Sequence, residues 1–122
     1  SLSARDGSKP IRGGVPVAFP QFADDGPMRL HGFARELTWQ HTKSEAAKSD
    51  ACGAFVRLTF EVDSDALAKH PRKDELTDAW YDARPFALQF SVTIGKATLD
   101  LVLHVRNPGP LKLPFTGGLH TY

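Results

Sequence analysis

Apolar and polar residues alternate with a period of two through two segments near the C-terminal end of the chain. The first covers residues 86–94, and its apolar positions are Phe86, Leu88, Phe90, Val92 and Ile94. The second covers residues 99–105, where Leu99, Leu101, Leu103 and Val105 resume the same alternation. This period is typical of a β-strand with one buried face, and Gly95-Lys96 between the segments favours a tight turn. The pattern predicts a β-hairpin that ends at the Asn-Pro-Gly-Pro sequence of residues 107–110.

Three other segments are expected to form strands. Residues 55–62 alternate in the same way, with Val56, Leu58, Phe60 and Val62 on one face. Residues 36–40 predict a shorter strand, and residues 113–116 predict another, which Pro114 should push to a sheet edge or a bend. The strands that these patterns predict are antiparallel neighbours.

Signals for helices are poor. Residues 65–69 and 74–80 can each form about one turn, and neither carries a sustained apolar stripe. Residues 42–50 are rich in Lys, Ser, Ala and Glu and predict an exposed hairpin loop. The expected fold class is therefore all-β, a sandwich or a barrel. Because the apolar face of such a sheet needs a second layer, the chain is expected to be part of a larger β-protein.

Composition narrows the classes of partner and compartment. The chain has 122 residues and a formal net charge of +1, so no bulk electrostatic field favours nucleic acid or an acidic membrane surface. No segment approaches the run of about 20 apolar residues that a membrane span needs. Cys52 is the single cysteine, which excludes an intrachain disulfide and favours a reducing compartment, so a cytoplasmic location is expected.

Two arginines stand on segments shaped by glycine and proline. Arg12 precedes Gly13-Gly14, where the backbone can bend and approach a ligand closely. Arg35 ends the sequence His31-Gly-Phe-Ala-Arg35, and in an extended chain His31, Phe33 and Arg35 would share one face. A guanidinium group suits a phosphate, so both arginines are candidate anion ligands. Solvated surface arginines are the alternative, and the spacing alone leaves both readings open.

Histidines supply the candidate proton-transfer groups. His31 precedes the glycine of its motif, and His120 follows Gly117-Gly118-Leu119, so both could face a cleft. A core histidine bonded to the backbone is the alternative for His120. No pair of histidines has metal-ligand spacing with a carboxylate, so no zinc site is predicted, and no glycine-rich phosphate loop is present.

Together these motifs resemble the aldose 1-epimerase superfamily, and within it the glucose-6-phosphate 1-epimerase branch. The matching segments share their order and spacing with that branch over essentially the whole chain. They are Ile11-Arg-Gly-Gly-Val-Pro16, Phe19-Pro-Gln-Phe22, His31-Gly-Phe-Ala-Arg35 with Trp39, Asn107, and Phe115-Thr-Gly-Gly-Leu-His-Thr-Tyr122.

The resemblance implies a galactose-mutarotase-like β-supersandwich, of which residues 1–122 would be the N-terminal and central part. It implies an isomerase that interconverts the α and β anomers of a hexose 6-phosphate without a metal or organic cofactor. His120 matches the acid that protonates the ring oxygen. Arg12 and Arg35 match residues that hold the phosphosugar, and His31 matches a histidine that contacts the sugar.

Two departures from the family pattern bear on this expectation. Leu30 stands where the family usually has a glutamine that contacts substrate, so the resemblance does not carry over that hydrogen bond to the sugar, and the hexose preference could differ. Arg29 is the candidate to supply the bond in its place. The family's catalytic glutamate and a substrate-binding aspartate lie beyond the position of Tyr122. Residues 1–122 alone are therefore expected to be inactive.

Three other functions remain open at this point. A non-catalytic phosphosugar-binding module would share the fold, and a free-hexose mutarotase would share the reaction. A plain β-sandwich interaction domain would need neither arginine at a site. The arginine pair argues against a neutral sugar, which does not need two guanidinium groups.

Overall fold

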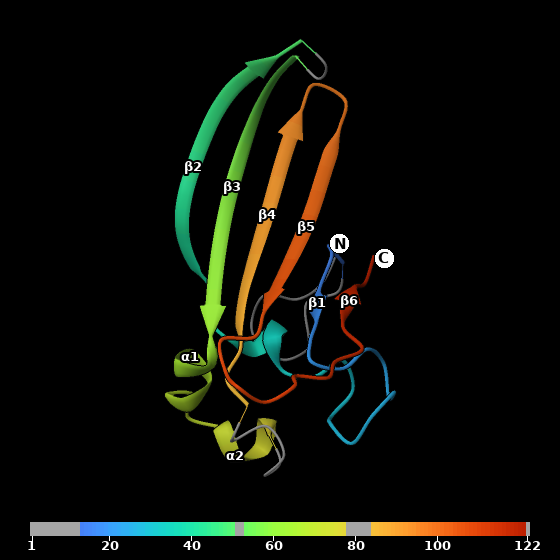
Figure 1. Ribbon diagram of the computed structural model, residues 1–122. Coiled ribbons are helices and arrows are strands. Elements are labelled where there is room, and N and C mark those ends of the chain that lie inside the picture. Colours follow the sequence, from blue (N-terminus) through green and yellow to red (C-terminus); the bar gives the residue numbers. More distant parts are fainter. Residues whose placement is uncertain (1–12, 51–52, 78–83, 122) are drawn as a thin grey trace. The chain divides into compact units, whose positions relative to one another are not determined.

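The computed structural model describes residues 13–50, 53–77 and 84–121, which form two compact units (Figure 1). The smaller unit contains the described residues up to Arg35 together with those from Phe115 onward. The larger unit runs from Glu36 to Pro114.

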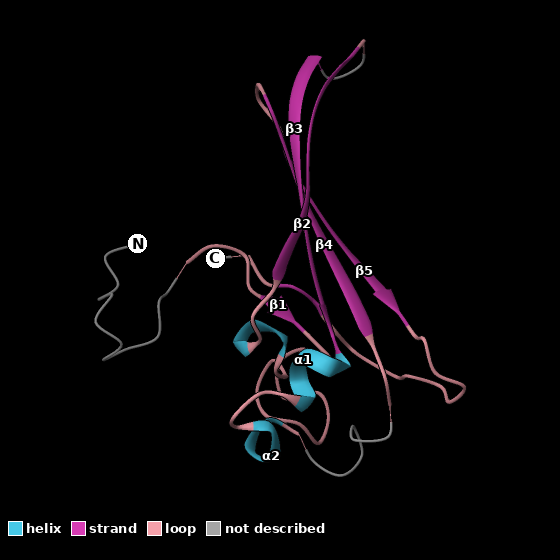
Figure 2. Ribbon diagram, turned by 90° about the vertical axis from the view of Figure 1, so that its left-hand side faces the viewer, coloured by secondary structure: helices cyan, strands magenta, loops and turns pink. Residues whose placement is uncertain are grey.

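A four-stranded antiparallel sheet dominates the larger unit. Its strands follow the order of the chain: β2 (Gln40–Ser49), β3 (Gly53–Asp63), β4 (Ala87–Gly95) and β5 (Leu99–Arg106). They lie side by side and twist strongly along their length (Figures 1 and 2). The predicted hairpin of residues 86–105 is confirmed, and the Gly95 N–H closes its turn by donating to the Thr98 carbonyl at 2.9 Å. The strand predicted over residues 55–62 is confirmed as part of β3.

Cross-strand register places the predicted apolar positions on one face of this sheet. Leu58 lies opposite Val92, which lies opposite Leu101, and directly opposed residues of antiparallel strands share a face. Burial along the face is uneven, because Leu88 is 2% exposed whereas Ile94 is 49% and Leu99 is 61% exposed. The expectation of one buried face therefore holds at one end of the sheet in the part of the chain that the structure describes.

That buried end is where two short helices lie, α1 (Ser64–Ala68) and α2 (Lys73–Leu76) (Figure 1). The Asp63 carboxylate caps α1 by accepting the backbone N–H groups of Asp65 and Ala66 at 3.0 and 3.1 Å. The predicted helical turn at 65–69 is thus confirmed. The one predicted at 74–80 is confirmed only over α2, since residues 78–80 lie outside the described ranges. Among the described residues of this unit, the buried apolar side chains are Leu37, Val62, Leu67, Leu76, Phe86 and Leu88.

Two predictions in the larger unit are wrong. Residues 42–50 were expected to form an exposed hairpin loop, but residues 42–49 belong to β2, a sheet edge paired with β3 along its length, and only Asp50 lies in a turn. Charged and polar residues are tolerated there because an edge strand is solvated and charges protect it from pairing with other chains. The strand predicted over residues 36–40 is absent: a 3₁₀ turn, η1 (Ala34–Glu36), comes first, and β2 starts only at Gln40.

The smaller unit is built mostly from irregular segments. Its two short strands, β1 (Val17–Ala18) and β6 (Gly118–Leu119), pair antiparallel and join the two ends of the described chain. Its core contains Phe19 and Phe33, both 0% exposed and packed edge to face with ring centroids 6.2 Å apart. The strand predicted at residues 113–116 is wrong: these residues form no strand, and the Thr116 N–H donates to the Pro20 carbonyl in a loop.

The fold class is all-β with antiparallel sheets, as predicted. Neither helix in the described ranges has the length or the apolar character that crossing a membrane requires.

Candidate active site

Three rings from separate segments of the smaller unit gather at one place: Phe22, His31 and His120. The two imidazole rings have centroids 5.1 Å apart and meet edge to face at 70°. Phe22 stacks on His120 at 5.7 Å and 25°, and it meets the edge of His31 at 5.4 Å. The cluster thus joins two histidines that lie near opposite ends of the sequence.

Strand pairing brings His120 to this place. His120 directly follows β6, which pairs with β1, and its backbone N–H donates to the Pro16 carbonyl at 3.0 Å. Nδ1 of His120 is buried, so Nε2 is the ring nitrogen through which it could reach a ligand.

A left-handed turn positions His31. Both His31 and Gly32 have φ near +65°, a region that residues with a Cβ atom rarely adopt. A Cβ atom on Gly32 would lie 2.3 Å from the Phe19 carbonyl oxygen, so only glycine fits. That same oxygen accepts the N–H groups of Phe33 and Ala34 at 2.9 and 3.1 Å. The turn is therefore held against the Phe19 backbone, and it sets the direction of the His31 ring.

This turn contradicts the extended arrangement expected for residues 31–35. His31 is half-buried, Phe33 is fully buried and Arg35 is exposed, so the three side chains do not share one face. The reason is that two consecutive residues with positive φ reverse the chain, after which η1 winds through Arg35. Arg35 accordingly has no buried face that would demand an anion.

Hydrogen bonding selects the tautomer of His31. The backbone N–H of Ala23 donates to Nδ1 of His31 at 3.1 Å, so the neutral ring carries its proton on Nε2. Burial lowers the pKa of His31 below its usual 6.5, and the positive charges of Arg35 and His120 lower it further. His31 is therefore a neutral donor through Nε2.

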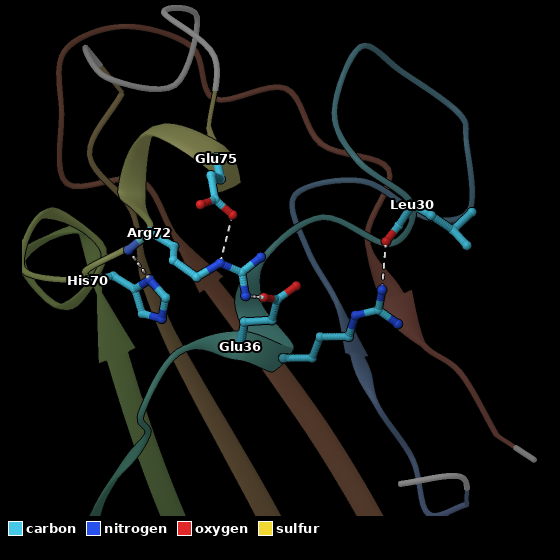
Figure 3. A network of polar contacts seen from close by, with 6 residues as sticks. Leu30, Glu36, His70, Arg72 and Glu75 are labelled. Carbon is cyan, nitrogen blue, oxygen red and sulfur yellow. Dashed lines mark hydrogen bonds and ion pairs between the residues drawn. The ribbon is translucent and has the colours of Figure 1, made fainter. Parts of the chain in front are cut away.

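The predicted arginines have different outcomes. Arg35 lies close enough to His31 to affect its pKa, and its Nη2 donates to the Leu30 carbonyl at 2.9 Å, as the dashed line that ends on Leu30 in Figure 3 shows. Arg12 lies outside the described residues, so its expected convergence with Arg35 stays a prediction. The structure thus brings His31 and His120 together, and Arg35 bonds to the residue that precedes His31.

Three further residues of this region had no predicted role. Phe22 contributes the stacked ring, and the Thr116 hydroxyl accepts the Phe22 N–H at 3.1 Å. Gln21 is 2% exposed, and its side chain bonds to the loop that precedes His31. All three lie inside the motifs that carry the family resemblance, and their place in those motifs is the sequence signal that could have identified them.

A second polar cluster, in the larger unit, has the character of a surface network. Arg72 donates to Glu75 at 2.7 Å and lies 3.5 Å from Glu36, and its backbone N–H donates to His70 at 3.2 Å (Figure 3). Exposed ion pairs of this kind contribute little to stability, because solvent screens them. Across the described ranges, no group of three His, Cys, Asp or Glu side chains is arranged to hold a metal ion.

Comparison with known proteins decides the family. The family model described as aldose 1-epimerase matches residues 2–122. The chain belongs to the aldose 1-epimerase family. The resemblance in the sequence motifs is thereby confirmed.

Two curated relatives of this aldose 1-epimerase family chain carry the name "Putative glucose-6-phosphate 1-epimerase". One, from Cenchrus ciliaris, is 30% identical over 119 residues, which cover 93% of this chain and 32% of the relative. The other, from Escherichia coli (strain K12), is 34% identical over 115 residues, which cover 92% of this chain and 32% of the relative. The chain therefore spans about a third of the length of these relatives. No solved structure matches it.

Proposed function

We propose that the protein carrying this chain interconverts the α and β anomers of a hexose 6-phosphate. The observation that carries the proposal is the pair of histidines at 5.1 Å beside an aromatic ring and an arginine. Membership of the aldose 1-epimerase family supports the class of reaction, and the names of the two relatives support the phosphorylated substrate.

The two histidines suit different roles. His31 is a neutral Nε2–H donor because Nδ1 is occupied by the Ala23 N–H, which suits a hydrogen bond to a sugar oxygen. Since a charge on His120 lowers the pKa of His31, the pair favours one added proton over two. His120 is assigned the role of proton donor to the ring oxygen, which the family resemblance implies.

The proposed reaction follows from this assignment. His120 gives its proton to the ring oxygen while a base takes the proton of the anomeric hydroxyl, and the bond between C1 and the ring oxygen breaks. The open chain is an aldehyde, and rotation about C1–C2 presents its other face. The reverse proton transfers close the ring as the other anomer. The base is not assigned to any residue of this chain.

The phosphate group is assigned to the arginines. Arg35 is exposed near His31, where a dianion could reach its guanidinium group, and Arg12 completes the proposed pair. A flat ring such as Phe22 beside the histidines suits the apolar face of a sugar.

Exchange NMR on the intact protein tests the proposal. The rate of anomer exchange should rise well above the spontaneous rate with glucose 6-phosphate, and much less with free glucose. Arg35→Ala should weaken binding of glucose 6-phosphate by about 2–4 kcal/mol, the scale of a lost charge-assisted pair, and should affect glucose far less. Arg57→Ala is the matched control, because Arg57 is an exposed arginine of β3 that lies over the Phe55 ring.

Each alternative has its own result. Equal losses for both sugars on Arg35→Ala would remove the phosphate assignment and favour a free-hexose mutarotase. Binding of glucose 6-phosphate without accelerated exchange would favour a phosphosugar-binding module.

A further inference from the structure

Gln21 is a buried amide whose side chain bonds entirely to one short loop. It is 2% exposed. Its Nε2 donates to the carbonyls of Ala23 and Met28, both at 3.1 Å, and its Oε1 accepts the Met28 N–H at 2.8 Å. The carboxamide therefore ties both ends of the loop 23–28 to one point.

Ala23 connects this loop to the candidate site. Its carbonyl accepts from Gln21 Nε2 and also from the backbone N–H of His31, at 2.9 Å. Its own N–H donates to Nδ1 of His31 at 3.1 Å. Gln21 and the His31 ring thus hold opposite sides of the same residue.

Ala23 has a backbone conformation that needs such support. Its φ is +49°, in the left-handed region that alanine rarely adopts. Without hydrogen bonds to hold it, the residue would relax toward negative φ, and its N–H would turn away from His31. The loop also packs closely on the amide, since a Cβ atom on Gly26 would lie 2.6 Å from Oε1 of Gln21.

We propose that Gln21 is a positioning residue, which holds the Ala23 N–H on Nδ1 of His31 and thereby presents the Nε2–H of His31 to the sugar. The inference rests on the proposed function only for the identity of that ligand. The positioning itself rests on the hydrogen bonds from Gln21 to Ala23 and from Ala23 to His31.

The pKa of His31 agrees with this arrangement. A ring whose Nδ1 accepts a backbone N–H loses that bond when Nδ1 is protonated, so the bond favours the neutral form. It acts in the same direction as burial and the charges of Arg35 and His120, which lower the pKa.

The direct test is the scalar coupling across the hydrogen bond between the Ala23 nitrogen and Nδ1 of His31, measured by ¹⁵N NMR on the intact protein. Wild type should show the coupling together with the Nε2–H tautomer. Gln21→Met keeps the size of the side chain and removes its hydrogen bonds, so the coupling should disappear. Gln89→Met is the matched control, because Gln89 is a glutamine of β4 whose Nε2 donates to Glu61.

Other results would overturn the inference. The inference is wrong if the wild-type protein shows no coupling, or if neutral His31 carries its proton on Nδ1. A folded Gln21→Met variant that keeps the coupling removes it as well. If Gln21→Met does not fold, Gly26→Ala displaces the amide from outside, and the same coupling decides in the same way.

Ligand affinity separates this inference from the proposed function. Gln21→Met should weaken binding of glucose 6-phosphate about three- to tenfold, the scale of one hydrogen bond. Loss of the coupling with unchanged affinity would support the positioning by Gln21 and contradict the sugar contact of His31.

Discussion

The two units of this chain differ in how regular their structure is. The larger unit is regular, and neighbouring segments of the sequence pair as neighbouring strands β2 to β5. The smaller unit joins the two ends of the described chain through β1 and β6, and it places Ala23, His31 and Gly32 at positive φ. The candidate chemistry lies in the irregular unit, whose shape depends on a few specific hydrogen bonds and not on a repeated ladder. Sites carried on loops commonly have this character.

The largest expected contrast is catalytic and concerns one histidine of each unit. In the intact protein His120→Asn should lower kcat by about 10²–10⁴, the usual weight of general acid–base catalysis, with little change in KM. His104→Asn, on an exposed position of β5, should leave both constants unchanged. The rate of anomer exchange, followed at several concentrations of glucose 6-phosphate, gives kcat and KM for each variant. A near wild-type rate for His120→Asn would mean that another group protonates the ring oxygen.

The next contrast compares two glycines with the same backbone conformation. Gly32 has φ +65° and Gly53, which opens β3, has φ +68°, so alanine at either position costs about 1–2 kcal/mol of backbone strain. A Cβ atom at Gly53 meets nothing within 4 Å, whereas one at Gly32 lies 2.3 Å from the Phe19 carbonyl. Gly32→Ala should therefore destabilise the protein by about 4 kcal/mol or more, and Gly53→Ala by much less.

Urea unfolding measures the two free energies of unfolding. Similar losses at both glycines would show that the Phe19 backbone yields easily, and the tight turn would then not be what positions His31.

A third contrast uses the two faces of the sheet. Ile94 and Val102 are 49% and 45% exposed, and they lie on the apolar and the polar face respectively. We expect residues 1–122 alone to associate through the apolar face, because exposed apolar sheet surface invites pairing. Ile94→Lys should weaken this association by about ten- to a hundredfold, since one such side chain contributes about 1.5–3 kcal/mol, and Val102→Lys should leave it unchanged.

Light scattering against concentration measures the association. Equal effects of the two lysines would mean that the apolar face is not the contact surface. A monomeric wild-type chain would contradict the expected need for a second layer.

The smallest expected effect is a dependence of stability on pH. The pKa of His31 in the folded protein lies below its usual 6.5, first because of burial and then because of Arg35 and His120. As the pH falls through 6.5 the unfolded chain binds this proton before the folded chain does, so stability decreases until the folded pKa is passed. Between pH 7 and 5, His31→Gln should reduce the slope of the free energy of unfolding against pH. Thermal unfolding in a pH series measures this slope. An identical slope in the variant would contradict the lowered pKa.

The sequence predicted best where structure is local. The alternation with a period of two over residues 86–105 predicted the β4–β5 hairpin, and the helical turn predicted at residues 65–69 formed as α1. The loop prediction failed for residues 42–49, because an edge strand can be polar on both faces and still be held by its partner. The sequence prediction failed again at His31, since only the position of the Phe19 carbonyl shows why residues 31–32 must turn.

Some candidate site residues could likewise be predicted from the sequence, and others could not. The motifs around His31, Arg35 and His120 were recognisable because chemistry restricts the residue types that a site can use. Gln21 lies in one of the matching motifs but had no predicted role, because its amide bonds to backbone groups, which any sequence supplies.

The sequence by itself determined the family, the all-β class, the strand faces of the hairpin and the identity of the candidate proton donors. Residue type and spacing carry those properties, so they are readable without coordinates. Tertiary structure alone decided that His31 and His120 lie 5.1 Å apart, that Phe22 stacks beside them, and that Nδ1 of His31 is occupied. These facts depend on the long-range pairing between β1 and β6 and on positive φ at Ala23 and His31. Hydrogen bonds among Gln21, Ala23 and His31 hold that backbone conformation in place.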